Sequence, residues 1–125
     1  MLEGIHHVLI SVTAELESET IAFYKEKLGL KEIPKPENLK KNGGAWFQLG
    51  SQQFHIAPEN NPLEYNAGSK RHVCFLVKDI DEASQYFKDR NVEVIPDSQP
   101  IPGWKRFYFR DPAGNRMECA QFSEQ

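Results

Sequence analysis

The feature that most constrains the fold of this chain is an internal repeat. The stretch HVLISV at residues 7–12 corresponds to HVCFLV at residues 72–77, and both are apolar strand patterns that begin with His-Val. Each is followed by an acidic turn and a helical pattern with an aromatic pair, FY in the first copy and YF in the second. Residues 45–57 likewise resemble residues 106–120, and both segments are typical of a β-hairpin. With one more short strand per half, LKEIP and NVEVIP, the repeat predicts a strand, a helix and three strands in each half.

The repeat also predicts the domain organisation. The chain has 125 residues, and a module of about 60 residues buries too little apolar surface to be stable alone. We therefore expect one domain over residues 1–125, of the α+β class, built from two pseudo-symmetric βαβββ modules at about 1–60 and about 68–125. The polar segment 57–70, which contains Pro and Gly, is predicted to be the linker.

Composition limits the partners of the chain. With 39% hydrophobic and 26% charged residues, it has the profile of a soluble globular protein. Its net charge is −3, and its 15 Lys and Arg are scattered among 18 Asp and Glu, which argues against nucleic acid as the main partner. No stretch approaches about 20 consecutive apolar residues, so we expect no membrane span. The two cysteines, Cys74 and Cys119, make no disulfide framework, and a cytoplasmic location is the default expectation.

Four polar side chains fall at matching places in the repeat. Strand residues alternate between two faces, and the apolar set of each predicted strand suits the face that packs against the helices. The opposite face receives His7 and His55 in the first module, and His72 and Glu118 in the second. His7 matches His72 at a spacing of 65 residues, and His55 matches Glu118 at a spacing of 63. If the two modules face each other, these four side chains converge in one cavity.

Imidazoles and a carboxylate are ligands that Zn²⁺, Ni²⁺, Fe²⁺ and Mn²⁺ accept. Taken singly, each of these residues is more often a hydrogen-bonded surface group than a ligand. Their equivalence in the repeat is what favours a metal site, because chance does not readily place His or Glu at all four positions.

The same alternation predicts a wall around this site. Trp104, Arg106 and Tyr108 share one face of the strand before the DPAG turn, and Trp46 is their counterpart in the first module. Arg106 could bind a substrate carboxylate or phosphate through two parallel hydrogen bonds, and the aromatic rings could stack on an apolar group. The alternative interpretation is that the aromatics are core residues and Arg106 is an exposed charge.

Several motifs give the chain a family resemblance. IHHVLISV, IAFYKEKLGL and HVCFLVKDIDEA, together with FYFRDPAGNRMEC, resemble the vicinal oxygen chelate superfamily, which includes glyoxalase I, fosfomycin-resistance proteins, extradiol dioxygenases and bleomycin-binding proteins. The D-P-x-G-N-x-x-E pattern is the most specific of these. The resemblance covers almost the whole chain and implies a curved, open half-barrel sheet with a metal in its concavity.

The resemblance also implies the ligands and marks departures from relatives. It places the metal at His7, His72 and Glu118, with His55 at the fourth position, where glyoxalase I carries a Glu that it uses in proton transfer. Glu118 remains a candidate base. Fosfomycin-resistance proteins typically carry Thr where this chain has Leu9, an apolar side chain that cannot hydrogen-bond a phosphonate. The metal expected is a divalent ion, Ni, Co, Fe, Mn or Zn.

The function that these features favour is that of a glyoxalase-like, metal-dependent enzyme of the lyase or isomerase type. It would act on a small oxygenated or thiol-conjugated metabolite through Lewis-acid stabilisation of an enolate-like intermediate. Two alternatives stay open: a drug- or metabolite-binding protein of the bleomycin-resistance type, and a small Fe(II) extradiol-type dioxygenase. The resemblance also implies a homodimer, and the sequence leaves open whether each site lies within one chain or across two.

Overall fold

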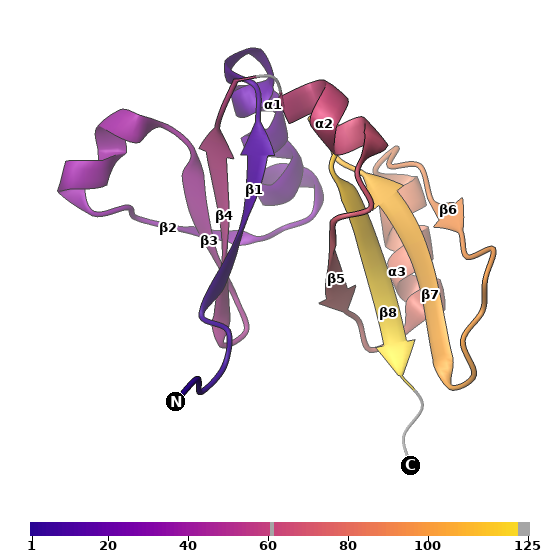
Figure 1. Cartoon of the computed structure of the whole chain (residues 1–125). Coiled ribbons are helices and arrows are strands. Elements are labelled where there is room, and N and C mark those ends of the chain that lie inside the picture. The colour runs from indigo at the N-terminus through magenta and orange to yellow at the C-terminus, as the bar shows by residue number, and fades with distance from the viewer. Residues whose placement is uncertain (61, 123–125) are drawn as a thin grey trace.

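The computed structural model, which describes residues 1–60 and 62–122, contains two modules that lie side by side and are bridged by a short helix (Figure 1). Module one contains β1 (His7–Val12), η1 (Ala14–Leu16), α1 (Glu17–Ala22), η2 (Phe23–Lys27), β2 (Lys31–Ile33), η3 (Glu37–Asn42), β3 (Ala45–Leu49) and β4 (Gln52–Pro58). The bridging helix is α2 (Pro62–Gly68). Module two contains β5 (His72–Leu76), α3 (Ile80–Asp89), β6 (Ile95–Pro96), β7 (Trp104–Arg110) and β8 (Arg116–Phe122).

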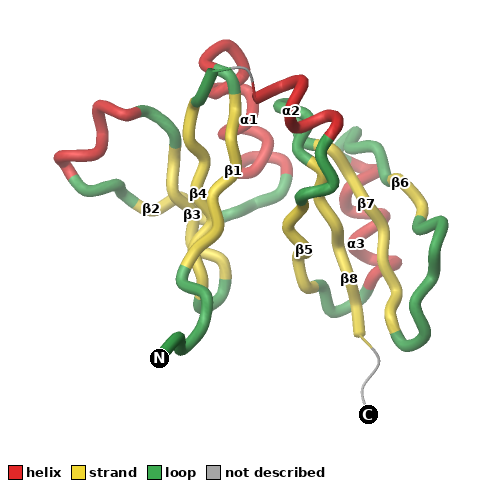
Figure 2. Tube along the Cα trace, viewed as in Figure 1, coloured by secondary structure: helices red, strands yellow, loops and turns green. Residues whose placement is uncertain are grey.

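Each module forms its own four-stranded sheet, and the two sheets have the same topology. The strand orders are β1-β4-β3-β2 and β5-β8-β7-β6, and the strand sets are separate in space (Figure 2). In each sheet the first strand pairs in parallel with the last, β1 with β4 and β5 with β8, and the remaining pairs are antiparallel. The predicted α+β fold of two βαβββ modules is confirmed.

The helical segments begin and end where local chemistry directs them. The Asp79 side chain caps α3 by accepting hydrogen bonds from the backbone N–H groups of Asp81 and Glu82, and Asn91 follows the helix with a positive φ of 61°. The first helical region is less regular, with a 3₁₀ turn, an α-helix and a π-helical turn in succession. Helix α2 was not predicted: it lies inside the segment that the sequence indicates as a linker. No helix among the described residues is long and apolar enough to cross a bilayer.

The two modules share one core, built from their helix-side faces. Phe54 of module one contacts Phe75 of module two with ring centroids 5.6 Å apart, and Phe23 lies 6.1 Å from Phe109. Phe54 and Phe109 are fully buried. Because the helix-side faces turn toward this common core, the opposite faces of the two sheets are left free to contact something else.

A buried polar cluster ties the modules together at the DPAG turn. The Tyr24 hydroxyl donates to Asp111 Oδ2 at 2.7 Å, across 87 residues of sequence. Asp111 Oδ1 accepts from the backbone N–H groups of Ala113 and Asn115, and the Asn115 side-chain amide donates to both carboxylate oxygens. Burial raises the pKa of Asp111, an effect that these hydrogen bonds oppose, and burial together with the neighbouring Asp111 raises the pKa of Tyr24. The predicted turn is confirmed by the hydrogen bond from Gly114 N–H to the Asp111 carbonyl.

Gly44 is a position where only glycine fits. It has a φ of +79°, and a Cβ there would lie 2.0 Å from the carbonyl oxygen of Ile56 on the neighbouring strand. We expect Gly44→Ala to lower the free energy of unfolding by about 3 kcal/mol or more, because backbone must move to relieve the clash. Gly50→Ala is the matched control in a denaturant titration. Its φ is +60° but nothing lies within 4 Å of an added Cβ, so its cost is about 1–2 kcal/mol. Equal losses in the two variants would contradict the clash.

Candidate functional site

The structure brings the predicted ligands together as two pairs, one on each sheet. In module one, the His7 and His55 rings stack with centroids 4.3 Å apart. In module two, His72 Nε2 lies 3.0 Å from Glu118 Oε1. All four side chains leave the face opposite the helices, as strand alternation predicts. His55 and Glu118 are buried, and His7 and His72 are exposed.

The pair in module one is held by an aromatic stack. The Trp46 ring lies parallel to the His55 ring at 4.1 Å, on a neighbouring strand. His55 Nε2 is 2.9 Å from the Gln53 side-chain oxygen, which can only accept, so Nε2 carries the proton and Nδ1 keeps its lone pair. Burial, followed by the neighbouring His7, lowers the pKa of His55 to about 4. His55 is therefore neutral at pH 7, which is the form that binds a metal.

In module two, both ring nitrogens of His72 face a hydrogen-bond acceptor, but a neutral imidazole can donate to only one of them. His72 Nδ1 lies 2.9 Å from the Lys70 carbonyl oxygen, and Nε2 faces the Glu118 carboxylate. A neutral imidazole carries a single N–H, so one of these two contacts requires a second proton or a cation. Glu118 Oε2 is buried, and within the described part of the chain it has no hydrogen-bond partner. A buried carboxylate oxygen without a donor is costly, and a bound cation would remove that cost.

Arg106 is placed beside this carboxylate by a loop. Arg106 Nε donates to Asp97 Oδ2 at 2.7 Å, and Nη2 donates to the Gln99 carbonyl at 2.8 Å. Its Nη1 then lies 3.6 Å from Glu118 Oε2, which is an ion-pair distance but too long for a hydrogen bond. The Arg106 guanidinium holds the pKa of Asp97 below its usual value, and Asp97 raises the pKa of Arg106.

The other predicted wall residues lie on both modules. Tyr108 contacts the His72 ring with centroids 6.3 Å apart. Trp104 is partly exposed and packs edge-on against Phe122. Trp46 is the module-one member, through its stack on His55. The aromatic residues therefore flank the two half-sites and do not form one enclosed wall within a chain.

The expected convergence of all four ligands does not occur within one chain. Among the residues that the structure describes, no group of three or more His, Cys, Asp or Glu side chains is arranged to hold a metal ion. The physical reason is the shared core, since the two helix-side faces turn inward and the two faces with the histidines do not meet. Each module therefore presents half of the predicted ligand set.

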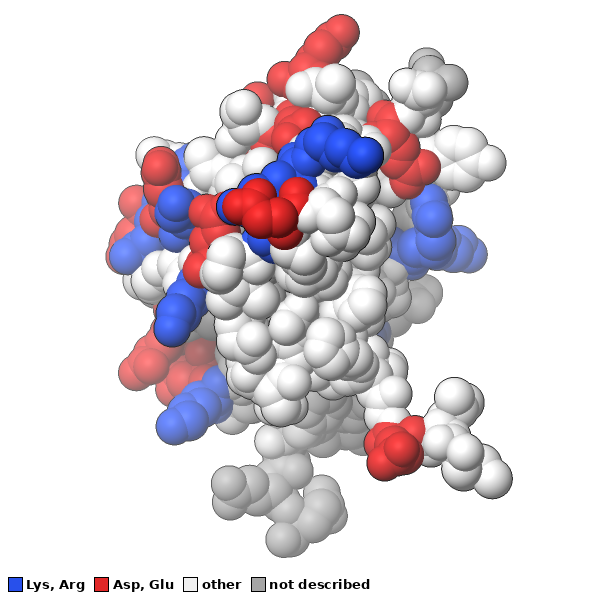
Figure 3. All heavy atoms as spheres, turned by 90° about the vertical axis from the view of Figure 1, so that its left-hand side faces the viewer, with Lys and Arg blue, Asp and Glu red and all other residues white. Residues whose placement is uncertain are grey.

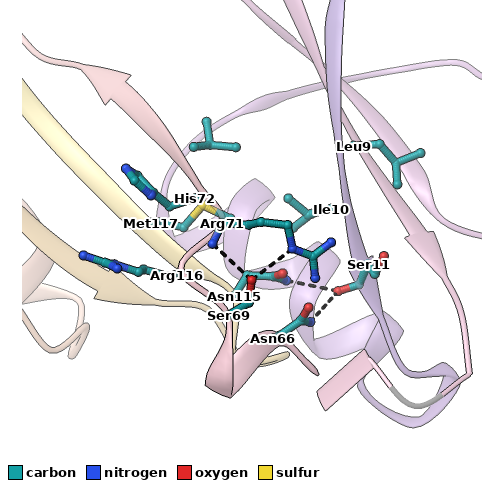
Figure 4. Close-up of a pocket in the computed structure, with 11 residues that line it drawn as sticks. Leu9, Ile10, Ser11, Asn66, Ser69, Arg71, His72, Asn115, Arg116 and Met117 are labelled. Atoms are coloured by element: carbon teal, nitrogen blue, oxygen red, sulfur yellow. Dashed lines mark hydrogen bonds between the residues drawn. The ribbon is translucent and has the colours of Figure 1, made fainter. Parts of the chain in front are cut away.

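A cavity of about 160 Å³ separates the edges of β1 and β5 next to the module-two half-site. Asn66 and Asn115 close its floor, because both side-chain amides donate to the Ser11 carbonyl. Arg71 extends across the cavity toward β1, whereas His72 and Arg116 extend to the opposite side (Figure 4).

Comparison with known proteins decides the family. The model of the Glyoxalase/Bleomycin resistance protein/Dioxygenase superfamily matches residues 4–119. The chain belongs to this superfamily. The crystal structure of a protein assigned to the glyoxalase family from Bacillus anthracis is 42% identical, with a TM-score of 0.88 over 98% of both chains. Uncharacterized protein YwkD of Bacillus subtilis (strain 168) is 30% identical over 122 residues, 90% of this chain and 91% of the relative.

A more distantly related solved structure is similar to this chain in fold alone. The E126Q variant of the fosfomycin resistance protein FosX from Listeria monocytogenes, crystallised with Mn(II) and 1S,2S-dihydroxypropylphosphonic acid, is 19% identical. Its TM-score is 0.72, over 95% of this chain and 90% of that one.

Sequence reasoning missed two polar residues of the module-two face. Asp97 precedes β7 in a loop, and no periodicity connects it to Arg106. Arg116 did carry a signal, because it stands two residues before Glu118 on β8 and therefore shares its face.

Proposed function

We propose that this protein is a glyoxalase-like, metal-dependent enzyme of the lyase or isomerase type that acts on a small oxygenated or thiol-conjugated metabolite. The observation that carries the proposal is the pair His72 and Glu118. Nε2 and Oε1 are 3.0 Å apart, which is about the separation of two ligands on one metal when each bond is about 2.0–2.2 Å. Glu118 Oε2 is buried and, among the described residues, has no hydrogen-bond partner, which also fits a site that binds a cation.

The ligand set of the proposed site is completed by a second copy of the chain. His7 and His55 of one copy would face His72 and Glu118 of the other, which gives two equivalent sites in a symmetric dimer. Leu9 and Leu76 share the faces of the two half-sites and are 54% and 76% exposed. Large exposed apolar side chains next to functional groups are typical of a surface that a partner covers. The side of the molecule formed by module one has a broad part free of Lys, Arg, Asp and Glu (Figure 3).

Nitrogen and carboxylate donors in this number suit Ni²⁺, Co²⁺, Fe²⁺, Mn²⁺ or Zn²⁺. A metal held by three imidazoles and one carboxylate keeps room for substrate when it is five- or six-coordinate. When bound, it supplies a Lewis acid that polarises a substrate oxygen. The FosX variant, which has a similar fold, was crystallised with Mn(II), and this supports the proposal of a divalent metal.

The side chains of the site divide the remaining work. Glu118 Oε1 is directed at His72 and would be the ligand atom, whereas Oε2, which has no hydrogen-bond partner among the described residues, would take a proton from a substrate carbon. Arg106 presents Nη1 next to this oxygen and would bind a second substrate oxygen. Trp46 and Tyr108 would supply apolar walls, and Trp104 would extend the wall toward the start of β7.

Metal analysis of protein purified without added metal tests the proposal. We expect about one divalent ion per chain, and less than about 0.2 per chain after Glu118→Gln, which preserves the shape of the side chain but removes its charge. Glu82→Gln, on the first turn of α3, is the matched control and should keep the ion. Less than about 0.2 ion per wild-type chain, together with failure to bind added Mn²⁺ or Ni²⁺, would reject the enzyme in favour of a metal-free binding protein.

A further inference from the structure

Two arginines stand directly opposite each other where β7 and β8 begin to pair. The register places Arg110 against Arg116, so both side chains leave the same face, with Cβ atoms about 5 Å apart. Like charges directly opposite on neighbouring strands repel and lower the stability of a sheet. Among the side chains that the structure describes, no carboxylate lies within ion-pair distance of either arginine. The positive charges of Arg110 and Arg116 are therefore not neutralised by any side chain that the structure describes.

Both guanidinium groups are held in place while part of their donor capacity stays unused. The Arg116 guanidinium lies over the Tyr108 ring, with Cζ 4.7 Å from its centroid, and a cation on a ring face keeps its N–H groups available at the edge of the plane. Arg110 uses Nη1 to donate to the carbonyls of Gly114 and Asn66, which leaves Nε and Nη2. Arg106, the third arginine of this face, differs because Asp97 and Glu118 already lie beside it.

The two arginines line one cavity. It has a volume of about 240 Å³ and is also lined by Ser98, Tyr108 and apolar Ile95. None of the described residues that line it is acidic. Two guanidinium groups, a serine and a tyrosine around an apolar base are the chemistry that recognises a carboxylate or a phosphate group.

We propose that this cavity is an anion subsite in which Arg110 and Arg116 bind the carboxylate or phosphate group of a small metabolite. The subsite adjoins the module-two half-site, because Arg116 precedes Glu118 by two residues on one face of β8 and is the cross-strand partner of His72. Two residues along a strand span about 7 Å. Where the proposed function holds, the substrate is thus an anionic metabolite whose charged group lies about 7 Å from the oxygens at the metal. The subsite itself requires no metal.

Calorimetric titration of the metal-free full chain at constant ionic strength tests the subsite, with inorganic phosphate, acetate and neutral glycerol as probes. We expect saturable binding of phosphate, acetate or both, and none of glycerol. Arg116→Gln should weaken that binding at least tenfold, because charge-assisted hydrogen bonds are lost, and Arg110→Gln should act in the same direction. Arg116→Lys keeps the charge without the planar donor pair, and should fall between wild type and Arg116→Gln.

Arg90→Gln is the matched control, because Arg90 stacks on Tyr86 of α3, outside this cavity, and its loss removes the same charge. Binding by Arg90→Gln should equal that of wild type. The subsite is refuted if neither anion binds, if Arg116→Gln binds as wild type does, or if Arg90→Gln loses as much. His55→Ala separates this result from the proposed function, because it should lose metal but keep the anion. Phosphate preferred over acetate assigns a phosphorylated metabolite, and the reverse preference assigns a carboxylate.

Discussion

A heterodimer of two metal-deficient variants is expected to recover half of the wild-type metal content. One chain carries His7→Ala and His55→Ala, and the other carries His72→Ala and Glu118→Gln. If each site takes two ligands from each chain, either homodimer has two damaged sites and binds no metal. In the heterodimer, all four substitutions fall in one site and the other site keeps all four ligands. The heterodimer therefore binds about one ion per two chains, whereas the wild-type dimer binds about two. Co-expression with two affinity tags, followed by metal analysis of the doubly tagged dimer, measures this directly.

The outcome also separates two architectures of the site. A site assembled within one chain would be damaged in every chain of the heterodimer, which would then hold no more metal than either homodimer. Thermal unfolding of each variant shows whether the fold survives, and the concern is greatest for His55, which is 4% exposed and stacked on Trp46. A heterodimer with His7→Ala alone in the first chain leaves the buried His55 in place. His7 is exposed on the strand surface, so this substitution creates no buried cavity, and we expect the same recovery of metal.

The repeat and strand alternation were enough to predict the strand–helix–three-strand order of each module and the strand face of each predicted ligand. His7, His55, His72 and Glu118 all lie on the predicted face, because period-two alternation fixes direction once a strand is identified. The relation between the modules could not be predicted in the same way. It depends on which faces share the core, and that choice rests on long-range contacts such as Phe54 with Phe75. Sequence patterns within one strand carry no information about it.

Helix α2 and the role of Asp97 were not predicted from the sequence, for different reasons. Helix α2 lies in a segment whose Pro, Gly and Asn residues are typical of a loop, and its buried Asn66 is fixed by donating to the carbonyls of Ser11 and Ala113. Those contacts are tertiary and override local propensity. Asp97 is placed by its ion pair with Arg106, which also depends on the folded loop. The side chains that were predicted lie on regular strands. Of the missed ones, Asp97 depends on a loop, whereas Arg116 lies on β8, where strand alternation carried a signal.

Removal of the Asp111 carboxylate should be among the most destabilising substitutions in the chain. Asp111 is 5% exposed and accepts hydrogen bonds from the backbone of the turn, from the Asn115 side chain and from Tyr24 of the other module. Asp111→Ala leaves these donors buried without an acceptor, and each lost partner costs about 1–3 kcal/mol. Because the losses share one site and are not additive, we expect a decrease of about 3–5 kcal/mol in the free energy of unfolding. Urea titration at a fixed chain concentration measures it, since dimerisation would shift the midpoint.

Two graded variants show whether the carboxylate acts through its hydrogen bonds. Tyr24→Phe removes one donor and leaves the turn intact, so its cost should be only about 1–2 kcal/mol. Asp111→Asn keeps an oxygen for the two backbone N–H groups but places an amide nitrogen opposite the Asn115 amide. Its loss of unfolding free energy should therefore lie between those of Tyr24→Phe and Asp111→Ala. The order follows from the geometry, because Oδ1 serves the turn and Oδ2 serves the contact between modules. An Asp111→Ala chain within about 1 kcal/mol of wild type would mean that the shared apolar core alone holds the modules together.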